Sequence, residues 1–168
     1  YLENLARHQE ELTGVPTFRD LDRLLSGLHN SDLIVCAARP GMGKTSFCLN
    51  IAQRVAIKYK IPVAIFSLEM SKEQLVLRML SSEALVNQSK LRSGYLLEED
   101  WKRLAIAAGR LAEAPIYIDD TPGIGVLEVR GKSRKLKAEK GLGLIIIDYL
   151  QLMQSSRRTE NRQQEIAD

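Results

Sequence analysis

The sequence predicts a three-layer α/β domain with a mainly parallel central sheet. Short runs that are apolar at every position alternate with longer stretches in which apolar residues recur at helical spacing. Strands that are apolar throughout are buried on both faces, which is typical of parallel sheets covered by helices. With 168 residues, 45% of them hydrophobic and 27% charged, the chain suits one ordinary α/β domain.

The N-terminal part of the chain is predicted to be helical. Residues 1–12 have a helical pattern that Gly14 and Pro16 interrupt, and residues 18–25 add one or two further helical turns.

The remaining chain alternates between strands and helices. Buried strands are expected at residues 33–37, 62–68, 115–118 and 144–147. Helices are expected at residues 45–59, from residue 72 onward, around residues 101–111 and at residues 125–140. Ser71 followed by Gln74 has the pattern of a capping box, which places the start of the second of these helices.

Composition excludes several classes of protein. The longest apolar runs are far shorter than the roughly 20 residues of a membrane-spanning helix, and no secretory signal pattern opens the chain. Cys36 and Cys48 have no zinc or redox spacing and lie within apolar patterns, so both are expected to be buried and reduced, as in a cytoplasmic protein. The net charge of +3 permits an anionic partner without requiring one.

The strongest chemical signal lies between the first predicted strand and the helix that follows it. Residues 38–45 have the pattern of a phosphate-binding loop, with alanine in place of the first glycine. Gly41 and Gly43 let backbone N–H groups converge on phosphate oxygens, and the helix N-terminus adds partial positive charge. Lys44 supplies a charge for the β- and γ-phosphates, and the Thr45 hydroxyl is a Mg²⁺ ligand. The predicted nucleotide-binding residues are Ala38, Arg39, Pro40, Gly41, Met42, Gly43, Lys44, Thr45 and Ser46.

Two acidic residues complete this prediction. Asp148 ends the last apolar strand in the manner of a Walker-B acid, and Mg²⁺ is a suitable partner for a carboxylate in that position. Glu69 ends the strand at residues 62–68, and ligands bind at the carboxyl edge of open α/β sheets. A carboxylate there can orient the water that attacks the γ-phosphate. The sequence therefore predicts ATP and Mg²⁺, with Thr45 and Asp148 at the metal and with Glu69 and Lys44 as catalytic residues.

Longer motifs run through nearly the whole chain. They are TGVPT at residues 13–17, AARPGMGKT at 37–45, FSLEMS at 66–71, IIDYLQLM at 146–153 and ENRQQE at 160–165. These motifs resemble those of the bacterial replicative DNA helicases of the DnaB type. The resemblance implies the C-terminal RecA-like P-loop motor domain of a ring-shaped hexamer that hydrolyses ATP, moves along single-stranded DNA and unwinds the duplex at the fork.

The resemblance also implies domain boundaries and partners. Residues 1–14 match the end of a linker helix, of which residues 1–12 pack against a neighbouring subunit of the homo-hexamer. Residues 15–168 match the N-terminal part of the motor domain. Arg157 and Arg158 lie where the family has a loop facing the central channel, which makes them candidates for contact with single-stranded DNA. Primase and a helicase loader are further implied partners, in the cytoplasm and with no membrane.

The family continues past the counterpart of Asp168. There it has a strand that lies between the Walker-B and phosphate-loop strands, and a basic finger that reaches the next subunit's ATP. We therefore expect the chain to hold only part of the motor, and the isolated 168 residues to be poorly active.

Two alternative functions remain open from the residues. A P-loop nucleotide kinase would be nearly complete at this length, although FSLEMS has no role in it. An ATP-gated assembly module would bind ATP without turnover, although it would not need the acid at Glu69. The basic stretch at residues 130–140 is interpreted as a solvated helix face, and Trp101 as a core residue rather than a base-stacking platform.

Overall fold

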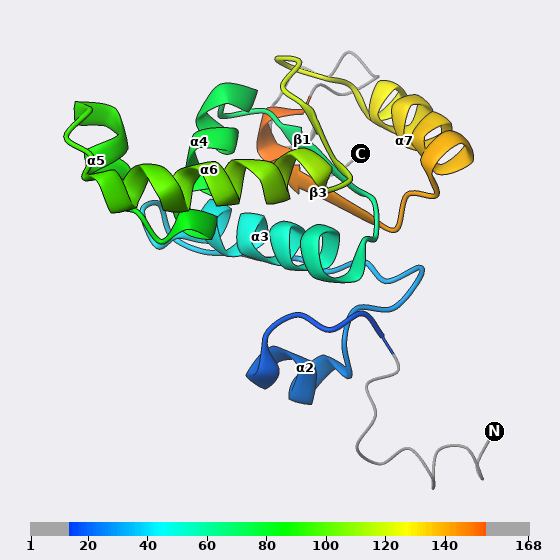
Figure 1. The fold of residues 1–168 in the computed structure, drawn as a ribbon. Coiled ribbons are helices and arrows are strands. Elements are labelled where there is room, and N and C mark those ends of the chain that lie inside the picture. Colours follow the sequence, from blue (N-terminus) through cyan, green and yellow to red (C-terminus); the bar gives the residue numbers. More distant parts are fainter. Residues whose placement is uncertain (1–13, 154–168) are drawn as a thin grey trace, which may run out of the picture. The chain divides into compact units, whose positions relative to one another are not determined.

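The computed structural model describes residues 14–153, and the chain divides into two compact units, residues 1–44 and 45–168 (Figure 1). The predicted linker helix at residues 1–12 and the two candidate DNA contacts, Arg157 and Arg158, lie outside the described residues. The predicted domain boundary at residue 14 therefore stays a prediction.

The first unit contains the short helix that the sequence predicts, α2 (Arg19–Leu25). A buried carboxylate organises the chain before it: the backbone N–H and the hydroxyl of Thr17 both donate to Asp22, at 2.7–2.9 Å. An antiparallel bridge between Val15 and Leu28 joins the two ends of this segment.

The second unit is built on a parallel sheet of three strands. They are β1 (Val63–Ser67), β2 (Ile116–Asp119) and β3 (Leu144–Asp148), in the order β2-β1-β3. β1 is central and buried at all five positions, which is why its sequence is apolar almost throughout. Three of the four predicted strands are confirmed.

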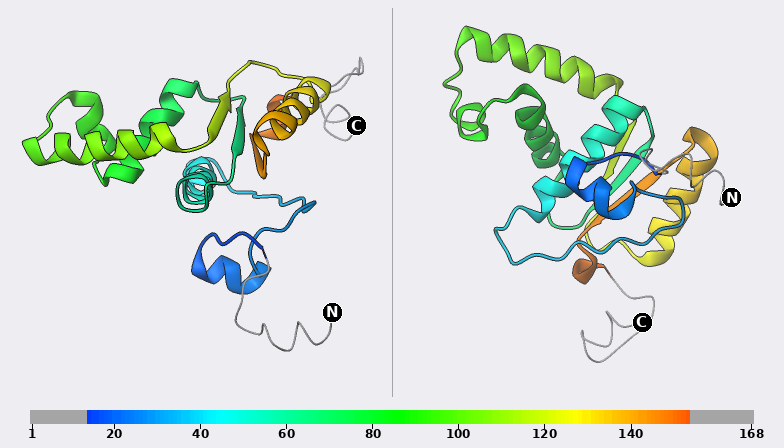
Figure 2. Two further views of the ribbon diagram at one scale, coloured as in Figure 1. Left: turned by 45° about the vertical axis from the view of Figure 1, so that its right-hand side comes forward. Right: turned by 90° about the horizontal axis from the view of Figure 1, so that it is seen from below.

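Helices cover both faces of this sheet and make the three predicted layers (Figure 2). α3 (Lys44–Gln53), α4 (Lys72–Ala84) and α6 (Glu98–Glu113) lie on one side, and α7 (Val126–Lys140) lies on the other. α3 continues into a π-helical turn (Arg54–Lys58), the short α5 (Gln88–Ser93) follows α4, and a 3₁₀ turn (Leu150–Leu152) follows β3. The capping box is confirmed: Ser71 Oγ accepts from Gln74 N–H, and Ser71 N–H donates to Gln74 Oε1.

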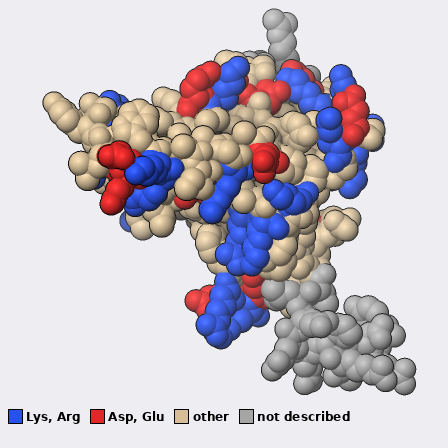
Figure 3. Space-filling model, in the orientation of Figure 1, with Lys and Arg blue, Asp and Glu red and all other residues tan. Residues whose placement is uncertain are grey.

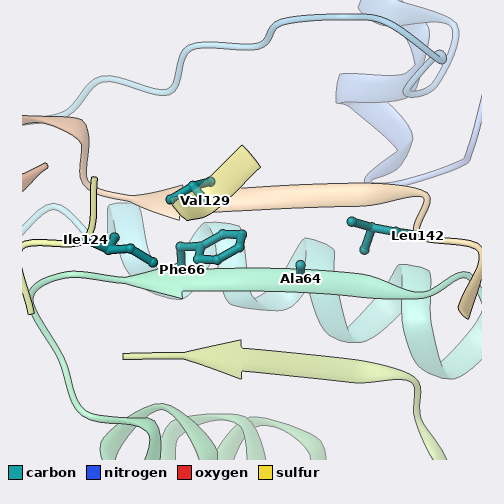
Figure 4. Close-up of a cluster of buried hydrophobic side chains, with 5 residues drawn as sticks. All are labelled: Ala64, Phe66, Ile124, Val129 and Leu142. Atoms are coloured by element: carbon teal, nitrogen blue, oxygen red, sulfur yellow. The ribbon is translucent and has the colours of Figure 1, made fainter. Parts of the chain in front are cut away.

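The core follows from the alternation of side chains along β1. Ala64 and Phe66 face α7 and pack with Ile124, Val129 and Leu142 (Figure 4). A second buried cluster lies between α4 and α6, with Ala84, Val86, Leu104 and Ala107. None of the helices within residues 14–153 has the length and apolarity required to cross a membrane.

The expectation of a strand at residues 33–37 is wrong for this structure. The segment forms no strand, and its apolar side chains are open to solvent, with Leu33 90% and Val35 74% exposed. A strand needs a neighbour that takes up its backbone hydrogen bonds. No other described segment pairs with this one, and the family resemblance places its neighbour beyond the counterpart of Asp168.

Two predictions of burial are also wrong. Cys36 is exposed because it lies in that unpaired segment, and Cys48 is only partly buried. Trp101 is 61% exposed. The buried positions of α6 are Asp100, Leu104 and Ala107, so Trp101 lies about 100° around the helix from the buried face.

Candidate nucleotide-binding site

Two of the predicted site residues meet directly. Thr45, in the first turn of α3, donates from Oγ1 to Asp148 Oδ2 at 2.6 Å. Asp148 is the last residue of β3 and is 5% exposed. The contact joins positions 103 residues apart in the sequence. Hydroxyl and carboxylate oxygens are hard donors of the type that Mg²⁺ takes in nucleotide sites, so this pair fits that ion chemically.

No cluster of three or more His, Cys, Asp or Glu side chains that could hold a metal occurs within residues 14–153. Such a cluster is not required for Mg²⁺ in a nucleotide site, because the ion keeps several waters and takes further oxygens from the phosphates. The donor set at Thr45 and Asp148 is therefore of the right size for Mg²⁺ bound with a nucleotide.

Glu69 lies at the same edge of the sheet. Ser67 at the end of β1 is in register with Asp148, and Leu68 N–H donates to the Asp148 carbonyl at 2.8 Å. Ser67 Oγ then donates to the carbonyl of Met70 at 2.7 Å and accepts from its N–H, which shapes the turn that carries Glu69. The Glu69 side chain is exposed and makes no hydrogen bond or ion pair with any described residue.

A third carboxylate at this edge is one that sequence reasoning missed. Asp119 ends β2, in register with Phe66, and accepts from Lys132 Nζ at 2.6 Å and from Thr121 N–H at 3.0 Å. Burial tends to raise the pKa of Asp119, but the hydrogen bonds from Lys132 and Thr121 outweigh it and lower this pKa. The same hydrogen bond, with a second one to Glu128, raises the pKa of Lys132. Asp119 ends a strand, as Asp148 does. This position is the feature of the sequence from which Asp119 could have been identified.

The basic helix also has its charges partly neutralised. Lys132 pairs with Asp119 and Glu128, and Lys137 Nζ donates to the carbonyl of Leu142. Figure 3 shows acidic groups interspersed among the Lys and Arg side chains on the visible face of the molecule. These contacts agree with the interpretation of α7 as a solvated face.

The phosphate-loop residues are distributed over both units. Residues 38–43 are exposed and belong to the first unit, with φ values of 78° at Gly41 and 85° at Gly43. This left-handed conformation is one that residues with a Cβ rarely adopt, so both positions need glycine. Lys44 is the first residue of α3, directly before Thr45, and Ser46 follows in the second unit.

The comparison with solved structures defines the class of fold. The ATPase domain of G40P matches 98% of this chain with a TM-score of 0.90 and 31% identity, and the chain covers 59% of it. A DnaB-like replicative helicase, whose structure was described with its interactions with primase, matches 99% with a TM-score of 0.88 and 30% identity, and 41% of that chain is covered. The second unit thus belongs to a RecA-like P-loop domain.

The family follows from the sequence matches. The model of the DnaB-like helicase C-terminal domain matches residues 14–168, and the chain belongs to this family. It is 56% identical to the replicative DNA helicase DnaC of Bacillus subtilis (strain 168) and 57% identical to the replicative DNA helicase DnaB of Geobacillus stearothermophilus. Each match covers 99% of this chain, which spans 37% of the length of either relative.

Proposed function

We propose that this chain is the ATP-hydrolysing part of a hexameric replicative DNA helicase, which moves along single-stranded DNA and unwinds the duplex at the fork in the cytoplasm. The observation that carries the proposal is the hydrogen bond from Thr45 to the buried Asp148, at the edge of the sheet where Glu69 also lies. Membership of the helicase family supports the assignment to DNA unwinding rather than to another use of ATP.

Each site residue has a distinct task in this proposal. Thr45 and Asp148 hold Mg²⁺, which when bound shields the phosphate charge. Lys44, with residues 38–43 and Ser46, binds the phosphates of ATP. Glu69 accepts a hydrogen bond from the attacking water and orients it toward the γ-phosphate. Because Glu69 is exposed and has no described partner, its carboxylate can rotate toward a water at this edge.

The partners form part of the same proposal. Assembly into a homo-hexamer uses the linker helix at residues 1–12, and Arg157 and Arg158 contact the phosphates of single-stranded DNA. Primase and a helicase loader dock on the assembled ring. One structural neighbour is a DnaB-like helicase described with its interactions with primase, which supports the primase assignment.

The test is ATP hydrolysis by the full-length protein, measured with and without single-stranded DNA. We expect single-stranded DNA to stimulate hydrolysis. Lys44→Ala should reduce hydrolysis to background, because the site loses the positive charge that binds the phosphates. Lys58→Ala is the matched control, since this exposed lysine lies at the far end of the same helical segment. Transfer of phosphate to a nucleoside monophosphate would instead establish a kinase. Tight ATP binding without turnover would establish a gated assembly module.

A further inference from the structure

A polar pocket lies between α3, α4 and the start of α5, within the second unit. Its volume is about 260 Å³, and its lining includes Ser46, Asn50 and Gln53 from α3, Arg78 and Ser82 from α4, and Gln88 from α5. The three α3 positions are spaced four and three residues apart, so they share one face of that helix. The pocket has no acidic residue in its lining.

Two buried polar atoms at this pocket have no hydrogen-bond partner among the residues that the structure describes. They are Gln53 Oε1 and Arg78 Nε. The amide of Gln53 is fixed at its other end, where Nε2 donates to the carbonyl of Met79 at 3.0 Å. Gln53 is 4% exposed, so its free oxygen faces the protein interior rather than bulk water. Buried polar atoms without partners are costly, and each one calls for an explanation such as a ligand.

Within the part of the chain that the structure describes, Arg78 has no carboxylate partner, in contrast to two other arginines of this unit. Arg103 pairs with Asp100, and Arg110 pairs with Glu83 at 3.0 Å, whereas Arg78 makes no ion pair within residues 14–153. Its side chain is partly buried in the pocket wall. A guanidinium in this setting provides the fork of donors that matches a phosphate or carboxylate.

The remaining lining groups show which ligand would complete the site. Asn50 is already engaged at both ends, by Ser46 and Ser82, and no described residue bonds the side-chain amide of Gln88. The open groups therefore include the donors of Arg78 and Gln88 and two acceptors, the amide oxygens of Gln53 and Gln88. We propose that this pocket is a binding site for a phosphate group that carries a neighbouring hydroxyl. The phosphate oxygens accept from Arg78 and Gln88, and the hydroxyl donates to Gln53.

This chemistry has two possible sources, free hydrogen phosphate and a small phosphate ester. Calorimetric titration of the full-length Lys44→Ala protein distinguishes them, because that variant weakens phosphate binding at the nucleotide loop. The two probes are inorganic phosphate and ribose 5-phosphate. Tighter binding of ribose 5-phosphate identifies an ester site, and equal affinities identify a site for the free ion. No binding of either probe overturns the proposal.

Substitutions then locate the binding. In the Lys44→Ala background, Arg78→Gln is expected to weaken binding of the probe about tenfold or more, because charge-assisted hydrogen bonds are lost. Arg54→Gln, the same charge change at an exposed position outside the pocket, is expected to leave the affinity unchanged. Equal affinity for the Arg78→Gln and Arg54→Gln proteins overturns the proposal.

A second variant distinguishes loss of the site from misfolding of the Arg78→Gln protein. Arg78→Lys keeps the positive charge but loses the fork of donors, so it is expected to bind the probe more weakly than the Lys44→Ala parent and more tightly than Arg78→Gln. An unchanged thermal unfolding temperature shows that the variant is folded. A crystal of the full-length protein soaked in selenate, a phosphate mimic with an anomalous signal, provides the position. A peak at Arg78 supports the site, and ordered water alone at that position overturns it.

Discussion

β1 and β3 both lead to an acidic residue at the same edge of the sheet, yet the two carboxylates are held in opposite ways. Asp148 is 5% exposed and accepts a 2.6 Å hydrogen bond from Thr45. Glu69 is exposed and has no bonding partner among the described residues. Metal ligands are commonly oriented by hydrogen bonds from neighbouring groups, whereas the hydrogen bonds of a catalytic acid or base often form fully only in the complex with substrate. The difference in restraint therefore matches the different roles proposed for the two acids.

The sharpest test of this comparison is Glu69→Gln in the full-length protein. The amide keeps the shape but is a poor base, so the chemical step is expected to slow by about 10² or more, a loss of at least about 2.7 kcal/mol of transition-state stabilisation. ATP affinity and the free energy of unfolding should not change, because Glu69 has no described partner to lose. Single-turnover hydrolysis and equilibrium nucleotide binding measure the two effects.

Glu73→Gln is the control for this substitution, as an exposed acid in the first turn of α4. If Glu69→Gln turns over at close to the normal rate, Glu69 does not orient the water, and the contrast between the two acids has no catalytic meaning.

Asp148→Asn should have a smaller effect, and of another kind. The amide oxygen can still accept from the Thr45 hydroxyl, so the fold is retained, but the charge that attracts Mg²⁺ is removed. We expect the Mg²⁺ concentration for half-maximal nucleotide binding to rise about 10- to 100-fold. Thr45→Ser, which keeps the hydroxyl, should behave as the unmodified protein. If the Mg²⁺ dependence of nucleotide binding is unchanged in Asp148→Asn, Asp148 is not a ligand of the metal.

The sequence predicted the central part of the fold because its signals there are local and repeated. Three apolar runs form β1, β2 and β3, and Ser71 and Gln74 cap α4 as predicted. Residues 33–37 have the same apolar pattern as β3 and remain unpaired and exposed. A run of apolar residues reveals the potential to form a strand, while the strand itself depends on a neighbour that can be far away in the sequence.

The candidate site likewise has features that the local sequence predicts and features that depend on residues far apart in the sequence. Acids at the ends of strands are visible in the sequence, which is how Asp148 and Glu69 were found. The contact that distinguishes them is not visible, because it depends on a pairing between Thr45 and a residue 103 positions away. Gln53 and Arg78 gave no signal either, since an unsatisfied polar atom can be recognised only once its neighbours are known. Trp101 was misplaced because apolar spacing alone does not fix which face of α6 is buried.

The smallest effect is expected at β2, the remaining strand of the sheet, which ends at Asp119. This carboxylate is bound to Lys132 at 2.6 Å and not to the helix that follows the phosphate loop. The partial exposure of this ion pair limits its contribution to about 0.5–1 kcal/mol. Since the hydrogen bonds to Asp119 lower its pKa in the folded state, the stabilisation is present above the unfolded pKa and is lost as the pH falls through the folded pKa. Asp119→Asn should therefore lower the free energy of unfolding at pH 7 by this amount.

Chemical denaturation at a series of pH values from 7 to 3 measures the effect, and the difference between the two proteins should shrink toward the acid end. Glu113→Gln, at an exposed position near the end of α6, controls for the loss of one negative charge. ATP hydrolysis by Asp119→Asn should remain within about twofold of normal, since a structural ion pair has no part in the chemistry. A loss of hydrolysis as large as that of Glu69→Gln would show that all three strand ends contribute to the site, and that restraint alone does not separate catalytic from structural carboxylates at this edge.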